Sequence, residues 1–355
     1  MIRARALLVA GLFALVVSAC TSGGPGAQPT AAPTRAAAAT ATATPAPTAT
    51  PVSFPEKDIT LINPFAGGNF ESQARLFAPI FQSKLPKQVK VIVENVAGGA
   101  GVIGYNKAID AAADGYTLTI DDPVGNGLRK IDQKANAKFE PTAWAWLGGW
   151  FSDFPGLGVR ASYSASTWQQ FVELGKSGRI TFATPGKGTL NHGQQQLLAK
   201  VFGLNVKFVH YQSTAEVRTA LARGEVDAYV APASTIATWV DAKEVKWITI
   251  LREGKDPQRP TVPTLDDIGA TKAQKDTILA VAGSARGWMT NKKVPPERVK
   301  ILRDAFWAAA NDPLWKSELA KVLIQANPTT GEDMQKFAEA FWPPFPAQWA
   351  EYTKE

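Results

Sequence analysis

Residues 58–85 of the chain read DITLINPFAGGNFESQARLFAPIFQSKL, and this stretch decides the fold class. It begins with a short apolar run, Ile59–Ile62, which has the length typical of a buried strand. A proline and two glycines follow, and residues 71–85 then place apolar side chains on one face of a helix. The helical spacing is carried by Ala74, Phe77, Ala78 and Phe81. A strand followed by a glycine loop and a helix indicates an α/β protein.

The same order of elements is repeated along the chain. Residues 89–93 and 116–120 are predicted strands on either side of a helix at 105–112, which favours a mostly parallel sheet. A second series has predicted strands at 180–183, 207–211, 226–230 and 245–251 and predicted helices at 193–202 and 214–223. The pattern ends with an extended segment at 278–289 and helices at 296–311 and 314–326.

Because the unit occurs twice, we predict two similar lobes with a cleft between them, each a mixed, mostly parallel sheet flanked by helices. Residues 56–150 and 280–335 are assigned to lobe 1, and residues 151–279 to lobe 2. The C-terminal segment, residues 336–355, is predicted to pack on lobe 1.

The N-terminus carries a targeting signal. Two arginines precede an apolar stretch at residues 6–19, which is too short to span a bilayer and is typical of a signal peptide. Residues 17–20, VSAC, resemble a bacterial lipobox, in which the cysteine is acylated and becomes the first residue after cleavage. Cys20 is the only cysteine in the chain. We therefore expect residues 1–20 to be a lipoprotein signal peptide and Cys20 to anchor the protein at a membrane surface. An ordinary signal peptide with a chance cysteine is the alternative.

A linker follows the signal. Residues 21–55 consist almost wholly of Thr, Ala, Pro, Gly and Ser, with seven prolines and Arg35 as the only charged residue. Such a segment cannot form a core, so we expect it to be disordered. As a coil it spans roughly 30–35 Å, enough to hold the globular body away from the membrane.

Composition excludes several classes of protein. One cysteine and two histidines leave no intrachain disulfide, no cysteine-based zinc site and no His-rich metal centre, so no metal and no cofactor are predicted. The formal charge is +7, but the 38 Lys and Arg residues are spread along the chain without a basic run. Nucleic-acid binding is therefore not expected.

Catalytic motifs are also missing, so no catalytic residue is predicted. There is no G-x-S-x-G elbow, and any triad would have to use His192 or His210. His192 lies in the first turn after a glycine loop, where it would contact a ligand or cap the helix. His210 is predicted to be a strand residue with a satisfied hydrogen bond. Most of the eleven tryptophans are expected to be core residues, among them Trp144, Trp146, Trp307 and Trp315.

Residues 99–104, GAGVIG, form a G-x-G-x-x-G pattern between a strand and a helix, and Asp121 and Asp122 lie 17 and 18 residues beyond it. Five residues separate the strand from the first glycine, and the pattern follows the second strand rather than the first. Both features are unlike a dinucleotide site. We interpret the glycines as a tight connection that lets the helix pack closely on the strand.

Two glycine loops carry the strongest functional signal. Residues 65–69, FAGGN, and residues 184–189, TPGKGT, each follow a predicted strand and begin a predicted helix. A helix N-terminus presents unpaired N–H groups and the positive end of the dipole, so it attracts anions. One loop in each lobe predicts a clamp for a carboxylate, although either loop alone is more often only a turn.

Motifs along the body resemble those of one family. They are PFAGG at 64–68, VEN at 93–95, DGYTL at 114–118, YQ at 211–212, VD at 226–227 and VPTL at 262–265. In this order, over residues 54–349, they are similar to the substrate-binding receptors of tripartite tricarboxylate transporters, the TctC-like or Bug receptors. The G-x-G-x-x-G pattern belongs to one of the loops of this resemblance.

The resemblance implies a two-lobed, type II periplasmic-binding-protein fold that holds a carboxylate through loop backbone groups and hydroxyls. By position, Phe65, Gly67 and Gly68 would provide the lobe-1 contact. The whole expected substrate-binding set is Phe65, Gly67, Gly68, Asn69, Glu71, Asp122, Gly186, Lys187, Gly188, Thr189, His192, Gln212, Ser213 and Arg286.

The chain departs from the family pattern in charged residues. Lys187 adds a charge to the second loop, Asp121-Asp122 replaces a small Ser-containing stretch, and Arg286 stands in a crossing segment where an aromatic is common. Lys187 and Arg286 together would suit a ligand with two carboxylates. An inward-pointing aspartate would instead pair with Arg286 or meet an amino group on the ligand. The alternative is that Lys187 is solvated and Arg286 belongs to an internal ion pair.

The sequence therefore predicts a monomeric, lipid-anchored extracytoplasmic receptor that closes on a small organic mono- or dicarboxylate and delivers it to membrane transporter subunits. One alternative is a sensory receptor that presents its ligand to a signalling partner. A less favoured alternative is an enzyme that uses the same cleft.

Overall fold

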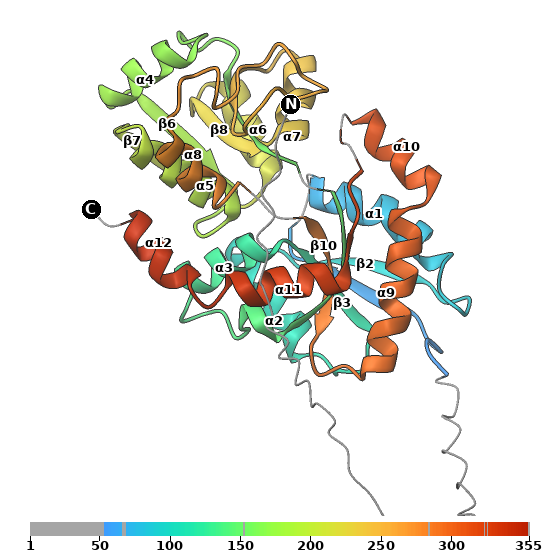
Figure 1. Cartoon of the computed structure of the whole chain (residues 1–355). Helices are drawn as coiled ribbons and strands as arrows, with labels where there is room; N and C mark the ends of the chain where they lie inside the picture. Colours follow the sequence, from blue (N-terminus) through green and yellow to red (C-terminus); the bar gives the residue numbers. More distant parts are fainter. Residues whose placement is uncertain are drawn as a thin grey trace, which may run out of the picture. The chain divides into compact units, whose positions relative to one another are not determined.

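Two β-sheets organise the chain (Figure 1). The structure is a computed structural model that describes residues 53–65, 69–151, 153–282, 285–322, 324 and 326–353. All of them belong to one compact unit, Pro51–Glu355. The predicted signal peptide, Cys20 and the predicted linker up to residue 52 lie outside the described residues.

The first sheet has six strands in the order β11-β4-β10-β3-β1-β2 and forms the centre of lobe 1. Its strands are β1 (Ile59–Asn63), β2 (Val91–Asn95), β3 (Thr117–Asp121), β4 (Trp144–Phe151), β10 (Arg286–Asn291) and β11 (Thr329–Thr330). β1 runs parallel to β2 and β3, whereas β10 runs antiparallel to β3 and β4.

The second sheet has five strands in the order β7-β6-β8-β5-β9 and forms the centre of lobe 2. Its strands are β5 (Pro155–Arg160), β6 (Ile180–Thr184), β7 (Val206–His210), β8 (Ala228–Pro232) and β9 (Val245–Ile250). β6 runs parallel to β7 and β8, whereas β5 runs antiparallel to β8 and β9. The predicted two-lobed α/β fold with mixed sheets is confirmed. The predicted predominance of parallel pairs is wrong, because β4, β5, β9 and β10 all join their sheets antiparallel.

Helices flank both sheets. Lobe 1 has α1 (Asn69–Gln82), α2 (Val102–Asp110), α3 (Pro123–Asp132), α9 (Pro296–Ala310), α10 (Pro313–Lys321), α11 (Gly331–Phe341) and the short turns η1 (Gly99–Gly101) and η2 (Pro141–Ala143). Lobe 2 has α4 (Trp168–Lys176), α5 (Leu190–Val201), α6 (Thr214–Arg223), α7 (Ala233–Asp241) and α8 (Lys272–Leu279). In the part of the chain that the structure describes, no helix is long and apolar enough to cross a membrane.

Two predicted elements near the C-terminus are wrong in extent. Residues 278 and 279 belong to α8 rather than to an extended segment, because Thr271 and Gln274 form a capping box that starts a helix there. The predicted helix 314–326 ends at Lys321. Beyond it, Ile324 is buried in the core and the N–H of Asn327 bonds to a carbonyl of β4, so this stretch follows the sheet instead.

The core of lobe 1 is unusually rich in aromatic rings. Phe77 of α1 lies with its ring centre 4.7–5.1 Å from four others: Trp150, Trp288, Phe306 and Trp315. Trp144, Trp146 and Trp315 are buried as predicted. Trp307 is 44% exposed, so its prediction as a core residue is wrong. It lies next to Phe306 on α9, and adjacent helical residues face different directions.

Two predictions concerning the ends of the body also need correction. Phe54 is 1% exposed and packs edge-on against Tyr116, at 4.9 Å between ring centres, so the globular body begins before the predicted end of the linker at residue 55. The final helix, α12 (Phe345–Thr353), contacts both α3 and α5, as Figure 1 shows, whereas α11 packs on β4 and α3. The C-terminal segment, as far as residue 353, therefore does not pack on lobe 1 alone.

An apolar cluster joins the two lobes at α12. It combines Leu128 of α3, Leu197 of α5, Val281, Phe345 and Trp349, all at most 4% exposed. The apolar face of α12 packs against both α3 and α5, and these contacts remove it from solvent. This cluster is a contact between the two lobes.

The glycine pattern at 99–104 has a packing role. A Cβ at Gly104 in α2 would lie 2.7 Å from the carbonyl oxygen of Val96 and 2.9 Å from Cα of Pro64. Only glycine lets α2 approach these two loops so closely, which confirms the interpretation of the pattern as a tight connection.

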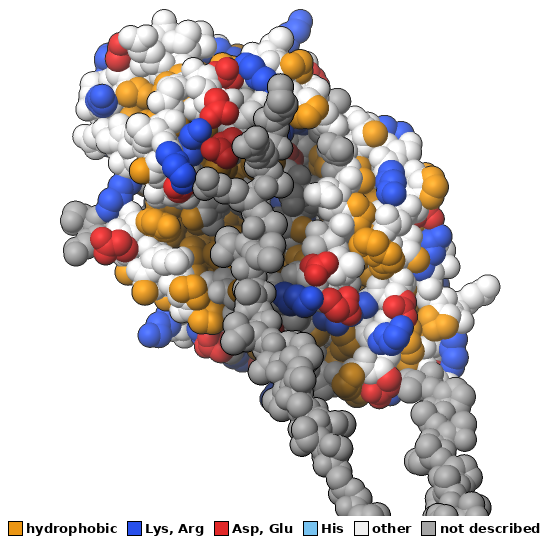
Figure 2. All heavy atoms as spheres, in the orientation of Figure 1, with side chains coloured by type: hydrophobic (Ala, Val, Ile, Leu, Met, Phe, Trp, Pro, Cys, Tyr) orange, Lys and Arg blue, Asp and Glu red, His pale blue; other side chains and the backbone are white. Residues whose placement is uncertain are grey.

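Charged side chains are distributed over both lobes. On the face drawn in Figure 2, basic and acidic groups are interspersed and do not gather into patches of one sign. Surface ion pairs such as Lys300–Asp304 at 2.7 Å and Lys275–Asp266 at 2.8 Å are examples of this mixture.

Candidate functional site

The loop between β6 and α5, which was predicted to contact the ligand from lobe 2, is held by its own hydrogen bonds. Thr189 is the N-cap of α5: its hydroxyl oxygen accepts from the N–H of His192 at 3.4 Å and donates to the carbonyl of Gly186 at 2.8 Å. The N–H of Gly188 donates to Nδ1 of His192 at 3.2 Å. These four residues are buried, whereas Lys187 is exposed. The loop therefore presents a defined backbone shape at a helix N-terminus.

This loop faces lobe 1 at two points. A Cβ at Gly186, where φ is +131°, would lie 3.0 Å from Cβ of Ala100 in η1. A Cβ at Gly188 would lie 2.8 Å from Cβ of Asp132, the last residue of α3. Nδ1 of His192 lies 3.8 Å from Oδ2 of Asp132. The loop of lobe 2 therefore packs directly against the η1–α3 region of lobe 1.

The predicted lobe-1 loop is described only in part. Gly67 and Gly68 lie outside the described residues, and Asn69 is described only as the first backbone position of α1. Glu71, in the first turn of α1, forms an ion pair with Arg75 at 2.8 Å on the same helix.

A buried ion pair that the sequence analysis missed lies in the lobe-1 wall. Nη1 of Arg129 donates to both carboxylate oxygens of Asp121, at 2.9 and 2.8 Å, and the two side chains are 2% and 0% exposed. Nε of Arg129 donates to the carbonyl of Ala100 at 2.9 Å. The guanidinium lies 5.0 Å from the ring centre of Phe65 and 5.2 Å from that of Tyr105. Each ion therefore has its countercharge within lobe 1.

Asp122, the predicted lobe-1 acid, is the N-cap of α3. Its Oδ1 accepts from the N–H of Gly125 at 2.7 Å, and the side chain is 4% exposed. Burial and the neighbouring charge of Asp121 raise the pKa of Asp122 to about 6, against the opposing effects of Arg129 and the Gly125 N–H. The N-terminus of α3 is thus capped by a carboxylate from the chain itself.

Arg286 begins β10, where the chain returns from lobe 2 to lobe 1. Its Nη1 donates to Oε1 of the buried Gln73 at 2.7 Å, and its guanidinium carbon lies 3.8 Å above the ring centre of Phe70. Burial lowers the pKa of Arg286, while Asp122 and Asp153 favour its charged form. An arginine keeps its charge in such a site, because its pKa is so high in water.

A third acid, Asp153, stands at the other crossing between the lobes and was not predicted. It lies between β4 and β5, and its Oδ2 accepts from the N–H of Ser234 in the first turn of α7 at 3.0 Å. Burial raises the pKa of Asp153, against the hydrogen bonds from Ser234 and the charges of Arg259 and Arg286. Both crossings between the lobes therefore carry a charged side chain.

Gln212 and Ser213 lie at the N-terminus of α6. The hydroxyl of Ser213 accepts from the N–H of Glu216 at 3.2 Å, and the backbone N–H of Gln212 donates to Oε2 of Glu216 at 3.1 Å. Nδ1 of His210 and Oγ1 of Thr184 share a hydrogen bond of 2.6 Å, which confirms the prediction of a strand histidine with a satisfied hydrogen bond. Because β7 and β8 run parallel to β6, the N-termini of α5, α6 and α7 lie at the same edge of the sheet.

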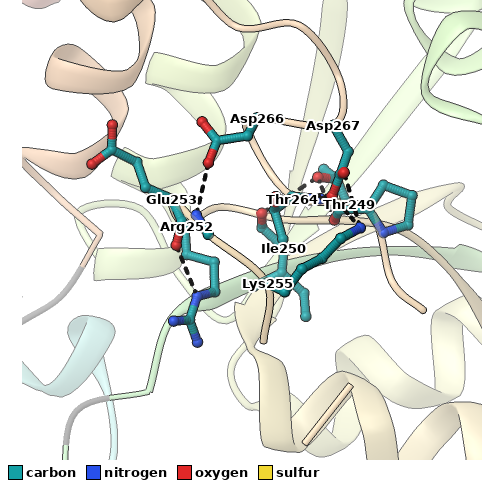
Figure 3. Close-up of polar contacts among 10 residues, drawn as sticks. Thr249, Ile250, Arg252, Glu253, Lys255, Thr264, Asp266 and Asp267 are labelled. Carbon is teal, nitrogen blue, oxygen red and sulfur yellow. Dashed lines mark hydrogen bonds and ion pairs between the residues drawn. The ribbon is translucent and has the colours of Figure 1, made fainter. Parts of the chain in front are cut away.

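The motif VPTL at 262–265 is structural (Figure 3). The N–H and the hydroxyl of Thr264 both donate to Oδ2 of Asp267 at 2.9 Å, and Nζ of Lys255 lies 2.8 Å from the same oxygen. The carbonyl of Pro263 accepts from the N–H of Ile250, at the end of β9, at 2.8 Å. Hydrogen bonds from Lys255 and Thr264 lower the pKa of Asp267 to about 2. The motif ties the loop that follows β9 to its strand.

Two cavities adjoin the charged groups at the segments where the chain crosses between the lobes. A cavity of about 230 Å³ between α1, α7 and α10 is lined by Gln73, the partner of Arg286, and by Ser234, the partner of Asp153. A second cavity, of about 450 Å³, is lined by Asp153 and Arg259 together with Ile324, Ala326 and Asn327 of lobe 1. Among the residues that the structure describes, no group of three or more His, Cys, Asp and Glu side chains is arranged to hold a metal ion.

The chain has two α/β lobes joined by two crossings, with three helix N-termini at one edge of the lobe-2 sheet. This architecture is typical of binding proteins of the periplasmic type. The model of the tripartite tricarboxylate transporter family receptor matches residues 74–341, and the chain belongs to this family. The resemblance predicted from the sequence motifs is confirmed.

Individual relatives agree with this assignment. A UPF0065 protein of Cupriavidus necator is 28% identical over 292 residues, which cover 80% of this chain and 84% of the relative. The periplasmic binding protein BugD has a similar structure, with a TM-score of 0.75 and 22% identity over 85% of this chain and 99% of that protein. MatC from Rhodopseudomonas palustris, solved with bound malate, has a TM-score of 0.74 and 20% identity over 85% of this chain and all (100%) of that protein. These structures confirm the predicted periplasmic-binding-protein fold.

Proposed function

We propose that the chain is the extracytoplasmic solute-binding receptor of a tripartite tricarboxylate-type transporter. It binds a small organic carboxylate between its lobes and delivers it to the membrane permease. The observations that carry this proposal are the apposition of the Gly186–Thr189 loop of lobe 2 with η1 and α3 of lobe 1 and the presence of a cation, Arg286, at a crossing between the lobes. The family and the malate bound to MatC support a carboxylate as the ligand class.

The proposed contacts divide by chemistry. Arg286 meets a ligand carboxylate, since a guanidinium offers two parallel N–H donors to it. The glycines of both loops, Gly67 and Gly68 in lobe 1 and Gly186 and Gly188 in lobe 2, allow close approach of the backbone. Because the N–H of Gly188 is donated to His192, its proposed role is to leave room rather than to donate. Phe65, Asn69, Glu71, Lys187, Thr189, Gln212 and Ser213 remain proposed lining residues.

The lobes close on the ligand about the two crossings. Support comes from the apolar cluster of α3, α5 and α12, which keeps the lobes joined on one side, and from the cavities that adjoin the crossings. Closing a hinge around a solute is the common mechanism of two-lobed binding proteins.

The receptor is held at the membrane through a lipidated Cys20 and the proline-rich linker, and it acts as a monomer. Support for the anchor is the lipobox-like stretch at residues 17–20. Two acyl chains are sufficient for stable membrane attachment.

A thermal-shift screen of the full chain in mild detergent tests the ligand class. The panel contains mono-, di- and tricarboxylates, with neutral sugars as controls. We expect at least one carboxylate to raise Tm and no sugar to do so, followed by calorimetry of the hit. A panel without any carboxylate hit contradicts the proposal. Uptake of the same carboxylate in cells with and without the gene then separates transport from sensing, because a sensory receptor would leave uptake unchanged.

A further inference from the structure

We propose that a groove along α1 and α10 is the surface on which a membrane subunit of the transporter docks, and that an apolar, uncharged segment of this subunit fills it. The inference rests on the proposed function, since it specifies where the receptor meets its membrane partner.

The groove consists of two adjoining cavities. α1 and α10 lie side by side on lobe 1 (Figure 1), and both line a cavity of about 410 Å³. Leu76 of α1 and Glu318 of α10 line this cavity and also the cavity of about 230 Å³ between α1, α7 and α10. The two cavities therefore form one groove, which runs from Ser83 and Asp312 on lobe 1 to Ser234 of α7 on lobe 2.

The groove exposes large apolar side chains. Leu76, Leu314 and Val322 are 47%, 57% and 45% exposed, and they line the groove together with Pro79 and Ile80. Single exposed apolar side chains are ordinary on a protein surface, whereas several that share one groove mark an interaction site.

Pro79 adds a hydrogen-bond acceptor to this apolar surface. A proline inside a helix has no N–H, so the carbonyl of Arg75, one turn earlier, has no i+4 donor within α1. Arg75 and Pro79 both line the larger cavity. A protein segment can donate to this carbonyl, whereas lipid tails cannot.

The charged side chains along the groove neutralise one another. They form three ion pairs: Arg75–Glu71 at 2.8 Å, Lys84–Asp312 at 2.7 Å and Lys321–Glu318 at 2.6 Å. A charged segment would lose its water here without gaining a countercharge. The groove therefore favours an uncharged, apolar segment.

The position of the groove favours a partner at the membrane. The described body begins at Ser53, whose hydroxyl accepts from Nζ of Lys87 at 2.6 Å, and Lys87 follows Ser83 by only four residues. The chain that leads to the proposed anchor at Cys20 therefore joins the body close to the lobe-1 end of the groove. A linker of this length and composition spans roughly 30–35 Å, which keeps the groove within reach of membrane subunits.

The groove also responds to the position of the lobes. In the smaller cavity one wall belongs to α7 of lobe 2, and the others belong to α1 and α10 of lobe 1. α7 starts beside a crossing, where the N–H of Ser234 donates to Oδ2 of Asp153 at 3.0 Å. Hinge closure therefore changes the width of the groove, and a subunit docked there distinguishes the closed receptor from the open one.

Uptake and solute binding, measured on the same variants of the full chain, test the proposal. Leu76→Asp and Leu314→Asp each place a charge in the uncharged groove. We expect each to lower the initial rate of carboxylate uptake in cells about tenfold or more, while calorimetry of the purified variant gives a solute affinity within about twofold of the wild type. Ile92→Asp is the matched control, because Ile92 is 49% exposed on β2 and does not line the groove. It should change uptake less than about threefold.

Photo-crosslinking identifies the partner without a charged substitution. A photoreactive phenylalanine derivative replaces Leu314, or Ile92 as the control, in cells that carry epitope-tagged membrane subunits. We expect an adduct with a tagged subunit from position 314 and none from position 92. Uptake within threefold of the wild type in both Asp variants, a parallel loss of solute affinity, or an adduct only with lipid or with a second receptor would overturn the inference while leaving the receptor function intact. Carboxylate uptake that is the same with and without the wild-type gene would reject both.

Discussion

Replacing Asp122 by Asn tests the electrostatics of the cleft in the absence of any ligand. Asp122 is 4% exposed and caps α3 by accepting from the N–H of Gly125 at 2.7 Å. The amide oxygen of Asn can accept the same hydrogen bond, and Asn and Asp are comparable N-cap residues. The substitution therefore removes a charge and keeps the cap, so the difference in stability between the two proteins reports the titration of one buried carboxyl group.

The expected magnitude follows from the pKa. Folding raises the pKa of Asp122 from 3.8 to about 6, because the group is buried and lies beside Asp121. The charged groups that face it are Asp121 on β3, Arg129 on α3 and Arg286 on β10. Between the two pKa values only the folded state holds the proton, so stability is lost as the pH rises through this window. A difference of about two pH units corresponds to about 3 kcal/mol.

Asp122→Asn should therefore be more stable than the wild type by about 3 kcal/mol above about pH 7, and the two should be equal below about pH 4. Urea unfolding followed by tryptophan fluorescence at a series of pH values measures the difference. Asp304→Asn is the matched control, because Asp304 is 65% exposed and forms a surface ion pair with Lys300 on the same helix, α9. It should change stability by less than about 0.5 kcal/mol at any pH. A difference for Asp122→Asn that stays constant with pH, or that favours the wild type as the pH rises, would refute the reasoning.

Three further predictions concern the loop, the anchor and the strand-end motif. Gly188→Ala should weaken carboxylate binding about tenfold or more, because the new Cβ would lie 2.8 Å from Cβ of Asp132 and hold the lobes apart. Calorimetry should compare it with Gly203→Ala, which has the same strain of a positive φ in open space, and equal affinities would remove the loop from the site. Cys20→Ser should release the protein from the membrane fraction or block its processing, and unchanged association on fractionation would contradict the anchor. Asp267→Asn should lower Tm at neutral pH, because hydrogen bonds to the charged carboxylate hold the pKa of Asp267 at about 2. This stabilisation of the wild type is lost as the pH falls from about 4 toward 2. A difference in Tm between the two proteins that persists at about pH 2 would contradict the prediction.

The strands that sequence could predict are those that carry their own apolar pattern. The predicted bounds of β1, β3 and β6 agree with the structure within one or two residues, because these strands are short runs of apolar residues and threonine, both of which favour strands. β4 and β5 contain glycines where large side chains lie over the sheet: a Cβ at Gly148 would lie 2.5 Å from the ring of Phe306, and one at Gly156 would lie 2.5 Å from the ring of Trp247. A glycine-rich stretch has no hydrophobic periodicity of its own, and the rings that make it a strand are supplied by distant parts of the chain. β4 and β5 are therefore absent from the predicted strands, whereas β9 matches the predicted strand at 245–251.

Some residues of the candidate site could be predicted from the sequence, and others could not. Asp122 and Arg286 could be selected from the sequence, because they are charged residues at positions where the family motifs have none. Arg129 could not, since an arginine on a helix is ordinarily solvated. One signal was available, because Asp122-Pro123 is a typical N-cap and N1 pair that starts a helix bearing Arg129 on its second turn. Arg129 points inward because it donates to the carbonyl of Ala100 in η1 and packs against two aromatic rings. These contacts form only in the folded chain. With that contact, Asp121 has its countercharge in Arg129, and Asp122 and Asp153 are the stronger of the acids that favour the charged form of Arg286. The charge balance of the lobe-1 wall thus depends on one ion pair between residues eight positions apart, which no sequence pattern records.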